Sequence, residues 1–205
     1  MFKIEKISII ETDVDCIVNP CRYNLTAGGG CCGIIHDAAG PELYEECKTI
    51  GHCDRGSAVI TKGYNLKQPY VIHTHGPFYT GSLEEPQLLY NCYKNSLNVA
   101  SAHKIKSIAF PFVSTGHYGY PASEAILIAL YAVKDSDLDI TFCYTDDYYQ
   151  PYIDLALADL EIYKDMSFED MIKDLRTDMS TYKKQRGKQR SLIRLFWLKF
   201  KNKFL

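Results

Sequence analysis

The chain contains a run of small residues that reads Ala27-Gly28-Gly29-Gly30-Cys31-Cys32-Gly33-Ile34-Ile35-His36. Three consecutive glycines follow the strand-like segment 15–19 and lead directly into a helical pattern. Glycine lets bare backbone approach a ligand closely, and the N–H groups at the start of a helix attract an anion. The run therefore predicts a loop that holds a phosphate or a diphosphate. The simpler alternative is a tight turn between a strand and a helix.

A second loop repeats this design further along the chain. The apolar segment 107–113 ends in Ser114-Thr115-Gly116-His117-Tyr118-Gly119-Tyr120-Pro121, and another helical pattern follows. Hydroxyl groups and glycine backbone suit phosphate oxygens, although Ser114 and Thr115 can also simply cap a turn. Two loops of this kind can close on a diphosphate from both sides.

Composition and charge set limits on the class of protein. A length of 205 residues with 46% hydrophobic side chains fits one domain with a real core and an appendage. Nine Lys or Arg and no Asp or Glu lie in 183–205, which leaves 14 basic against 25 acidic residues in 1–182. A body with a net charge of −11 is a poor general binder of nucleic acid, so any attraction to polyanions or membranes belongs to the tail.

Cysteine usage indicates the compartment and the metal content. Eight cysteines occur without a preceding secretory signal, which predicts reduced thiols and a cytoplasmic protein. The chain has no Cys-x-x-Cys pair, and the group Cys47, His52 and Cys53 lacks a second chelating pair. We therefore expect no metal and no cofactor, and no apolar run is long enough to span a bilayer.

Hydrophobic periodicity predicts an α/β domain. Strands are expected at 3–10, 15–19, 57–64, 70–75, 107–113 and 139–145, and helices at 33–50, 86–103, 122–133 and 149–160. This order indicates a mixed, mostly parallel sheet with helices on both faces. In open sheets of this type ligands bind beyond the carboxyl ends of the strands, where both glycine loops are expected to lie.

The composition changes near Asp165, and we place a boundary between a domain at 1–163 and a tail at 164–205. Two further helices are expected at 168–179 and 190–204. On the second, an apolar stripe is flanked by basic residues; the stripe consists of Ile193, Phe196, Trp197, Phe200 and Phe204. Such a helix is typical of a membrane-surface or partner-docking element, and it can equally fold back onto the acidic domain.

Five stretches in colinear order resemble a macrodomain of the MacroD-like branch. They are Asp15-Cys16-Ile17-Val18-Asn19, the glycine loop from Gly28 through His36-Asp37-Ala38-Ala39-Gly40-Pro41, Val71-Ile72-His73-Thr74-His75-Gly76-Pro77, Cys92-Tyr93-Lys94-Asn95-Ser96-Leu97, and the segment from Phe110 through Tyr120-Pro121. The resemblance covers roughly residues 1–160. It implies a three-layer α/β/α domain that binds ADP-ribose, with adenine at one end of a cleft, the diphosphate between the two loops and the distal ribose beside the first loop.

In many relatives the resemblance also implies an activity, either removal of ADP-ribose from modified proteins or deacetylation of O-acetyl-ADP-ribose. This chain departs from the pattern of active members. It reads Asn19-Pro20-Cys21-Arg22 where they usually read Asn-Ala-Ala-Asn, so Arg22 replaces the Asn that holds the distal ribose. Cys32 replaces an Asp found in many members, and Ser8 replaces the Asp that recognises adenine.

The aromatic platform for adenine falls near Thr145, with Tyr144 and Tyr148 adjacent. The full set of residues that we expect to contact the ligand is Ser8, Ile9, Asn19, Cys21, Arg22, Gly28, Gly29, Gly30, Cys31, Cys32, Gly33, Ile34, Val113, Ser114, Thr115, Gly116, His117, Tyr118, Tyr144 and Thr145.

Three of these residues are candidates for catalysis, namely Arg22, Cys32 and His117. Arg22 can donate two hydrogen bonds to a phosphate or a ribose, or it can face solvent. It cannot accept a hydrogen bond from a ribose hydroxyl as Asn does. No local His or acid activates Cys32, which favours a space-filling role. His117 can act on a water molecule or can be a solvated loop residue.

Three classes of function remain open from the sequence. The first is a module that binds ADP-ribose or ADP-ribosylated protein, the second is a metal-independent ADP-ribosylhydrolase, and the third is a degenerate scaffold that acts through its basic tail. We expect no sequence-specific nucleic acid partner, and we assign any membrane or protein contact to residues 183–205.

Overall fold

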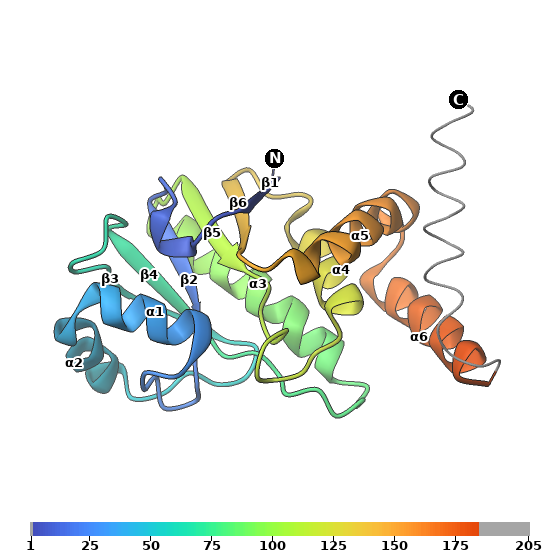
Figure 1. The fold of residues 1–205 in the computed structure, drawn as a ribbon, viewed down its shortest axis with the longest axis horizontal. Coiled ribbons are helices and arrows are strands. Elements are labelled where there is room, and N and C mark those ends of the chain that lie inside the picture. The colour runs from blue at the N-terminus through green and yellow to red at the C-terminus, as the bar shows by residue number, and fades with distance from the viewer. Residues whose placement is uncertain (1, 185–205) are drawn as a thin grey trace.

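The computed structural model describes residues 2–184, which form a six-stranded sheet between two layers of helices (Figure 1). The strands are β1 (Phe2–Lys6), β2 (Cys16–Pro20), β3 (Ala58–Lys62), β4 (Tyr70–Thr74), β5 (Ser107–Pro111) and β6 (Asp139–Tyr144). The helices are α1 (Gly30–Ala39), α2 (Pro41–Ile50), α3 (Glu85–Ala102), α4 (Ala122–Val133), α5 (Gln150–Tyr163) and α6 (Phe168–Lys184). Two 3-10 turns, Ile9–Glu11 and Asp147–Tyr149, complete the elements of this part of the chain.

The strands lie in the order β1-β6-β5-β2-β4-β3. Every neighbouring pair is parallel except β3 and β4, which are antiparallel. The predicted mixed, mostly parallel sheet is therefore confirmed. Because the parallel strands β1, β6, β5, β2 and β4 run the same way, the loops that follow them gather at one edge of the sheet.

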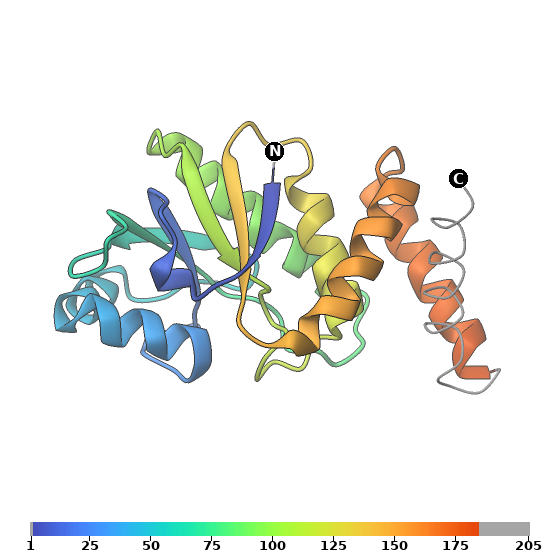
Figure 2. The same ribbon diagram turned by 45° about the horizontal axis from the view of Figure 1, so that its top comes forward.

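Alternate residues of the central strands enter two separate cores. Val18, Phe110 and Phe142 pack beneath α3, α4 and α5, whereas Ile17 and Ala109 pack beneath α1 and α2. Figure 2 shows the same division from another angle, with α1 and α2 in blue on one side of the sheet. The three-layer α/β/α arrangement is confirmed, and it follows from strands that are apolar on both faces.

The single helix predicted at 33–50 is wrong, because the structure has two helices there. Helix α1 ends at Gly40, whose φ of 88° lies in the left-handed region, and α2 begins at Pro41. Proline lacks an N–H and disfavours helical backbone in the residue before it. The Gly40-Pro41 pair thus ends α1 and starts α2, which the spacing of apolar residues over 33–50 did not indicate.

The strand predicted at 3–10 is too long. β1 ends at Lys6, and the chain then turns, with the Glu11 N–H donating to the Ser8 carbonyl at 2.9 Å and the Thr12 hydroxyl to the Ile9 carbonyl at 2.7 Å. These bonds carry Ser8 and Ile9 out of the sheet and over its carboxyl edge.

The helix predicted at 168–179 is present as α6, and it packs against the body of the domain. Met171 is fully buried, and the Phe168 ring lies 4.4 Å from the Tyr90 ring of α3 between ring centres. The division of the chain at residue 163 stays a prediction. The helix predicted at 190–204 lies outside the described residues. So does the segment 183–205, to which membrane or partner contact was assigned, except for Lys183 and Lys184 at the end of α6. Within 2–184, none of the helices combines the length and apolar character that crossing a bilayer requires.

One carboxylate fastens the first residues of two central strands together. Asp15 accepts hydrogen bonds from the N–H groups of Lys106 and Ser107, each at 2.9 Å. The bond from Lys106 is the main reason why the pKa of Asp15 lies below its ordinary value of 3.8, because it favours the charged form.

We expect Asp15→Ala to lower the free energy of unfolding by about 1–2 kcal/mol at neutral pH, since two amide donors lose a charged acceptor. A depressed pKa contributes stability above the pKa of the unfolded state and loses it as pH falls through the folded pKa. The difference between the two proteins should therefore be full above pH ~4 and shrink below it. Urea unfolding at several pH values measures this, and a difference that grows on acidification would contradict it.

Candidate functional site

A cleft of about 700 Å³ lies at the carboxyl edge of the sheet. Its walls come from the segments that follow β1, β2, β5 and β6, together with the start of α1. This volume is in the range of pockets that hold a small molecule of nucleotide size. The two glycine loops, separated by more than 80 residues in the sequence, face each other across it.

The first wall is the start of α1. Gly29 is the N-cap, with no side chain capping the helix, so the N–H groups of the first turn are available to a ligand. Gly33 explains how the loop can lie so close to its own helix, because a Cβ there would stand 2.6 Å from the Gly28 carbonyl oxygen. Gly33 thus lies behind the wall and does not line the cleft.

The second wall is the loop 112–120, which is anchored from below. The Val113 N–H donates to the buried Tyr93 hydroxyl at 2.9 Å, and the Tyr120 N–H donates to the Ser114 carbonyl at 3.0 Å. Between these anchors Ser114 adopts a φ of 67°, and its buried Oγ has no partner among the described residues. An orphaned hydroxyl in a left-handed turn that lines a cleft indicates a polar ligand.

Gly76, which follows β4, supports the second wall from behind. A Cβ on Gly76 would overlap with the Ser114 Oγ and lie 2.7 Å from the Val113 Cγ1. Gly76 was not among the predicted contact residues. Its signal was the glycine that ends the strand motif His73-Thr74-His75-Gly76.

The cleft lining contains Arg22 and His117 but no Asp or Glu. Arg22 is exposed and has no carboxylate partner within the described residues; its Nε lies 3.4 Å from the position of a Cβ on Gly28. His117 is also exposed, at the turn of the second loop. In a domain with a strong excess of acids, a lining without carboxylates favours an anionic ligand.

Cys32 lies at the start of α1, where a helix terminus would ordinarily lower a thiol pKa. Burial instead raises the pKa of Cys32, and contacts with the Gly28 backbone, the Asn19 amide and Arg22 offset this only in part. Burial also raises the pKa of the neighbouring Cys31 to about 12. Both side chains are therefore neutral thiols at pH 7, and among the described residues no histidine or carboxylate is hydrogen-bonded to the Cys32 Sγ, which lies 4.0 Å from the Thr26 carbonyl oxygen.

Asn19 lies beneath the cleft as part of a buried chain of hydrogen bonds. Its Nδ2 is 3.0 Å from His73 Nδ1, and His73 Nε2 is 2.9 Å from the Thr61 hydroxyl. If the amide donates to Nδ1, the imidazole carries its proton on Nε2 and donates it to Thr61. Burial lowers the pKa of His73 to about 3, so this ring is neutral and fixes the orientation of Asn19.

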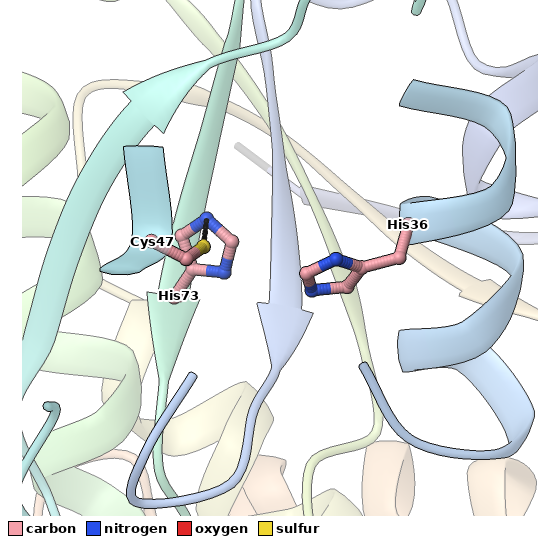
Figure 3. Close-up of side chains that lie close together, drawn as sticks. All are labelled: His36, Cys47 and His73. Atoms are coloured by element: carbon pink, nitrogen blue, oxygen red, sulfur yellow. Dashed lines mark hydrogen bonds between the residues drawn. The ribbon is translucent and has the colours of Figure 1, made fainter. Parts of the chain in front are cut away.

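Figure 3 shows the three buried side chains His36, Cys47 and His73, which each offer one possible ligand atom within 4.8 Å of the others. Both ring nitrogens of His73 already make hydrogen bonds, and the Cys47 Sγ lies 3.9 Å from His73 Nε2, the contact dashed in Figure 3, whereas His36 Nε2 has no partner within the described residues. Structural zinc takes four ligands, so the residues present do not make a zinc site. The expectation of no metal stays a prediction, and we assign these residues to packing.

The far end of the cleft is lined by Ser8, Ile9, Tyr144 and Thr145. An aromatic residue outside the predicted contact set, Tyr149, also lines the cleft, and its hydroxyl shares a hydrogen bond of 2.9 Å with Thr115 Oγ1. Tyr148, which was considered for the same role, is more than half exposed and does not line the cleft.

The structure brings together all the predicted contact residues except Asn19 and Gly33, which lie behind the walls. Around the cleft it adds Ile7, Pro20, Gly76, Pro111, Phe112, Cys143 and Tyr149. That the predicted residues contact a ligand stays a prediction.

Comparisons with known proteins agree on one family. The family model described as the Macro domain matches residues 18–129. A macro domain-containing protein of Chlorobaculum tepidum is 45% identical over 166 residues, which cover 78% of this chain and 91% of the relative. The ADP-ribose glycohydrolase MACROD2 of Homo sapiens is 46% identical over 138 residues, 64% of this chain and 32% of that longer protein.

Solved structures give the same result. The Oceanobacillus iheyensis macrodomain with ADP has a TM-score of 0.74 and 32% identity, and the match covers 78% of this chain and 90% of that one. The Trypanosoma brucei macrodomain in complex with ADP-ribose has a TM-score of 0.69 and 33% identity, with 76% and 68% covered.

The thiols at the start of α1 provide a test of the site chemistry. Because their pKa values are raised, we expect iodoacetamide at pH 7.5 to modify Cys31 and Cys32 at least ~10-fold more slowly than a cysteine in an unfolded peptide. Peptide mapping by mass spectrometry over time measures the two rates, with the urea-unfolded protein as the control. Rapid modification of Cys32 would instead identify it as an activated nucleophile.

Proposed function

The chain belongs to the Macro domain family, and on this basis we propose that its cleft binds ADP-ribose, either free or attached to a protein. The observation that carries the proposal is the pairing of an uncapped helix start with an amide-rich loop across a cleft without carboxylates. A diphosphate is the part of ADP-ribose that needs such donors most. No metal is required for this role.

We assign the diphosphate to the space between Gly28–Gly30 and Ser114–His117. Within the second loop, the N–H groups of Gly116 and His117 have no acceptor among the described residues, and the Ser114 hydroxyl is likewise unpaired. When donors already have the orientation that the ligand needs, binding loses little free energy to ordering them. Arg22 adds the one fixed positive charge of the lining.

We assign adenine to the end formed by Ser8, Ile9, Tyr144 and Tyr149. Phe112 and Tyr149 lie 5.7 Å apart between ring centres and give this end an apolar, aromatic floor. Ser8 offers a hydroxyl without a charge, so recognition there depends more on stacking than on a carboxylate. The distal ribose then falls near Asn19, Arg22 and Tyr118.

Hydrolysis is a second candidate function, favoured by the 46% identity with a human protein named ADP-ribose glycohydrolase. In this reaction a water oxygen bonds to the anomeric carbon of the distal ribose, and the bond to the protein side chain breaks. The leaving oxygen takes up the proton that the water loses. Among the residues lining the cleft, His117 is the side chain best suited to move that proton.

Two observations reduce the case for efficient hydrolysis. Arg22 stands where an Asn would hold the distal ribose, and Cys32 is a neutral thiol without an activating base. Deacetylation of O-acetyl-ADP-ribose uses the same cleft and faces the same limits. We therefore place binding first. With eight unpaired cysteines, we also propose a cytoplasmic location.

Calorimetric titration with ADP-ribose tests the first proposal. We expect micromolar affinity, about −7 to −9 kcal/mol. Incubation of the same protein with a mono-ADP-ribosylated substrate then tests hydrolysis. Failure to bind ADP-ribose, ADP or an ADP-ribosylated protein would instead support a scaffold that acts through its basic tail.

Valine at either Gly29 or Gly116 should lower the affinity for ADP-ribose by at least ~100-fold and leave the melting temperature unchanged. Nothing lies within 4 Å of a Cβ at either position, so the fold has room for the side chain but the ligand does not. Calorimetry and thermal unfolding measure the two effects. Ser101→Val, on the exposed end of α3, is the control. Unchanged affinity in both glycine variants would move the site elsewhere.

Arg22→Asn should raise the turnover of mono-ADP-ribosylated protein on the order of tenfold, because Asn restores an acceptor for the ribose and misplacement by about 1 Å can cost ~100-fold in rate. Single-turnover release of ADP-ribose measures this. The matched control is Arg55→Asn, since Arg55 is also exposed but does not line the cleft. Robust wild-type turnover that falls in Arg22→Asn would show that Arg22 itself takes part in the reaction.

A further inference from the structure

Helix α6 lies beyond the residues that the family model matches, and through Arg176 it contacts α4 and the loop before α3. Figure 1 shows α6 at the opposite end of the molecule from α1 and α2, beside α5. Phe168 and Met171 fix its first turns to the body. Further along, Arg176 turns its guanidinium towards the domain, and only 19% of this side chain is exposed.

The Arg176 guanidinium joins two separate segments. Its Nη2 donates to Glu124 Oε1 on α4 at 3.3 Å, and its Nη1 donates to the Ser82 carbonyl in the loop before α3 at 2.9 Å. The Glu124 side chain is almost completely buried, and its Oε2 has no partner in the part of the chain that the structure describes. Arg176 is the cation that compensates this buried charge.

Glu124 passes the contact on to the second glycine loop. The same Oε1 accepts a hydrogen bond of 3.0 Å from the hydroxyl of Tyr120, the buried last residue of that loop. The Tyr120 N–H in turn donates to the Ser114 carbonyl at 3.0 Å. A short chain of polar bonds therefore runs from Arg176 to Ser114, a residue of the cleft lining.

The hydrogen bond from Arg176 to the Ser82 carbonyl is connected to the same loop through a second set of hydrogen bonds. Glu85 orders the turn that carries Ser82, because it accepts bonds from the Thr80 N–H and hydroxyl at 2.7 and 2.6 Å. One residue earlier, the Tyr79 N–H donates to the Tyr118 carbonyl at 2.9 Å. The two routes hold residues 118 and 120 on either side of Gly119.

We propose that Arg176 is a positioning residue, which holds the loop 114–120 in the conformation that receives the diphosphate. The inference rests on the proposed binding of ADP-ribose, and it adds that α6 is part of the binding machinery although it touches no ligand. Removing Arg176 leaves the buried Glu124 carboxylate without a cation, so Glu124 takes up a proton or shifts towards solvent. Either change weakens the charged acceptor that holds the Tyr120 hydroxyl. The loop 114–120 then loses one of its supports, while the first loop, on α1, keeps its own.

Arg176→Ala tests the proposal in two ways. We expect the affinity for ADP-ribose to fall about tenfold, and amide hydrogen exchange to accelerate in peptides covering 114–120 but not in those covering 28–36. The exchange measurement needs no ligand. It therefore stays informative if the wild-type protein fails to bind ADP-ribose, an outcome that would overturn the proposed function alone.

Three further variants separate positioning from general stability. Glu124→Gln combined with Arg176→Ala removes the stranded charge and keeps an acceptor for Tyr120, so it should recover most of the lost affinity. Arg176→Lys, which retains a charge for Glu124, should show a smaller loss and serves if Arg176→Ala does not fold. Tyr163→Phe removes a hydrogen bond to Asp174 elsewhere on α6, so it should lower stability without changing affinity.

Equal affinity and equal loop exchange in wild type and Arg176→Ala would overturn the proposal. So would a loss of affinity in Tyr163→Phe as large as that in Arg176→Ala, because the effect would then come from the docking of α6 in general.

Discussion

Both walls of the cleft depend on a glycine that leaves room for a neighbouring group where a methyl group would not fit. At Gly33 this neighbour is the Gly28 carbonyl oxygen, and at Gly76 it is the side chains of Ser114 and Val113. Gly33 lets the first glycine loop lie against its own helix, and Gly76 lets the second loop lie against the end of β4. Neither residue needs to touch a ligand. They set the distance between the walls, and the donors on each wall are useful only at that distance.

The cleft combines weak donors instead of a few strong charges. The one fixed cation of its lining is Arg22, and the remaining attraction comes from the Gly116 and His117 amides and the Ser114 hydroxyl, which have no partner among the described residues. In a domain with so many surface acids this arrangement has a clear benefit. Aligned amides favour a diphosphate locally without drawing in every polyanion at long range, as a basic patch would do.

The sequence predicted the layers, most strand positions and both loops, because local patterns encode them: apolar runs, helical stripes and glycines next to helix starts. It did not predict the break at Gly40-Pro41, because the helical spacing of apolar residues continues from α1 into α2 although glycine and proline end one helix and start the next. Residues that join the site through tertiary contacts, such as Tyr149 and Gly76, left only faint signals. The pairing of Arg176 with Glu124 left none, because 52 residues separate them and neither stands in a motif.

The sheet order also has a consequence for how the domain forms during synthesis. β1 pairs only with β6 among the described strands, in a register that joins Phe2 to Ile140. Until the ribosome has released about 140 residues, β1 has no strand beside it and β5 presents an open edge. Such distant pairing slows folding and exposes apolar strands to other chains. We expect the nascent chain to need protection from aggregation for longer than its modest size suggests.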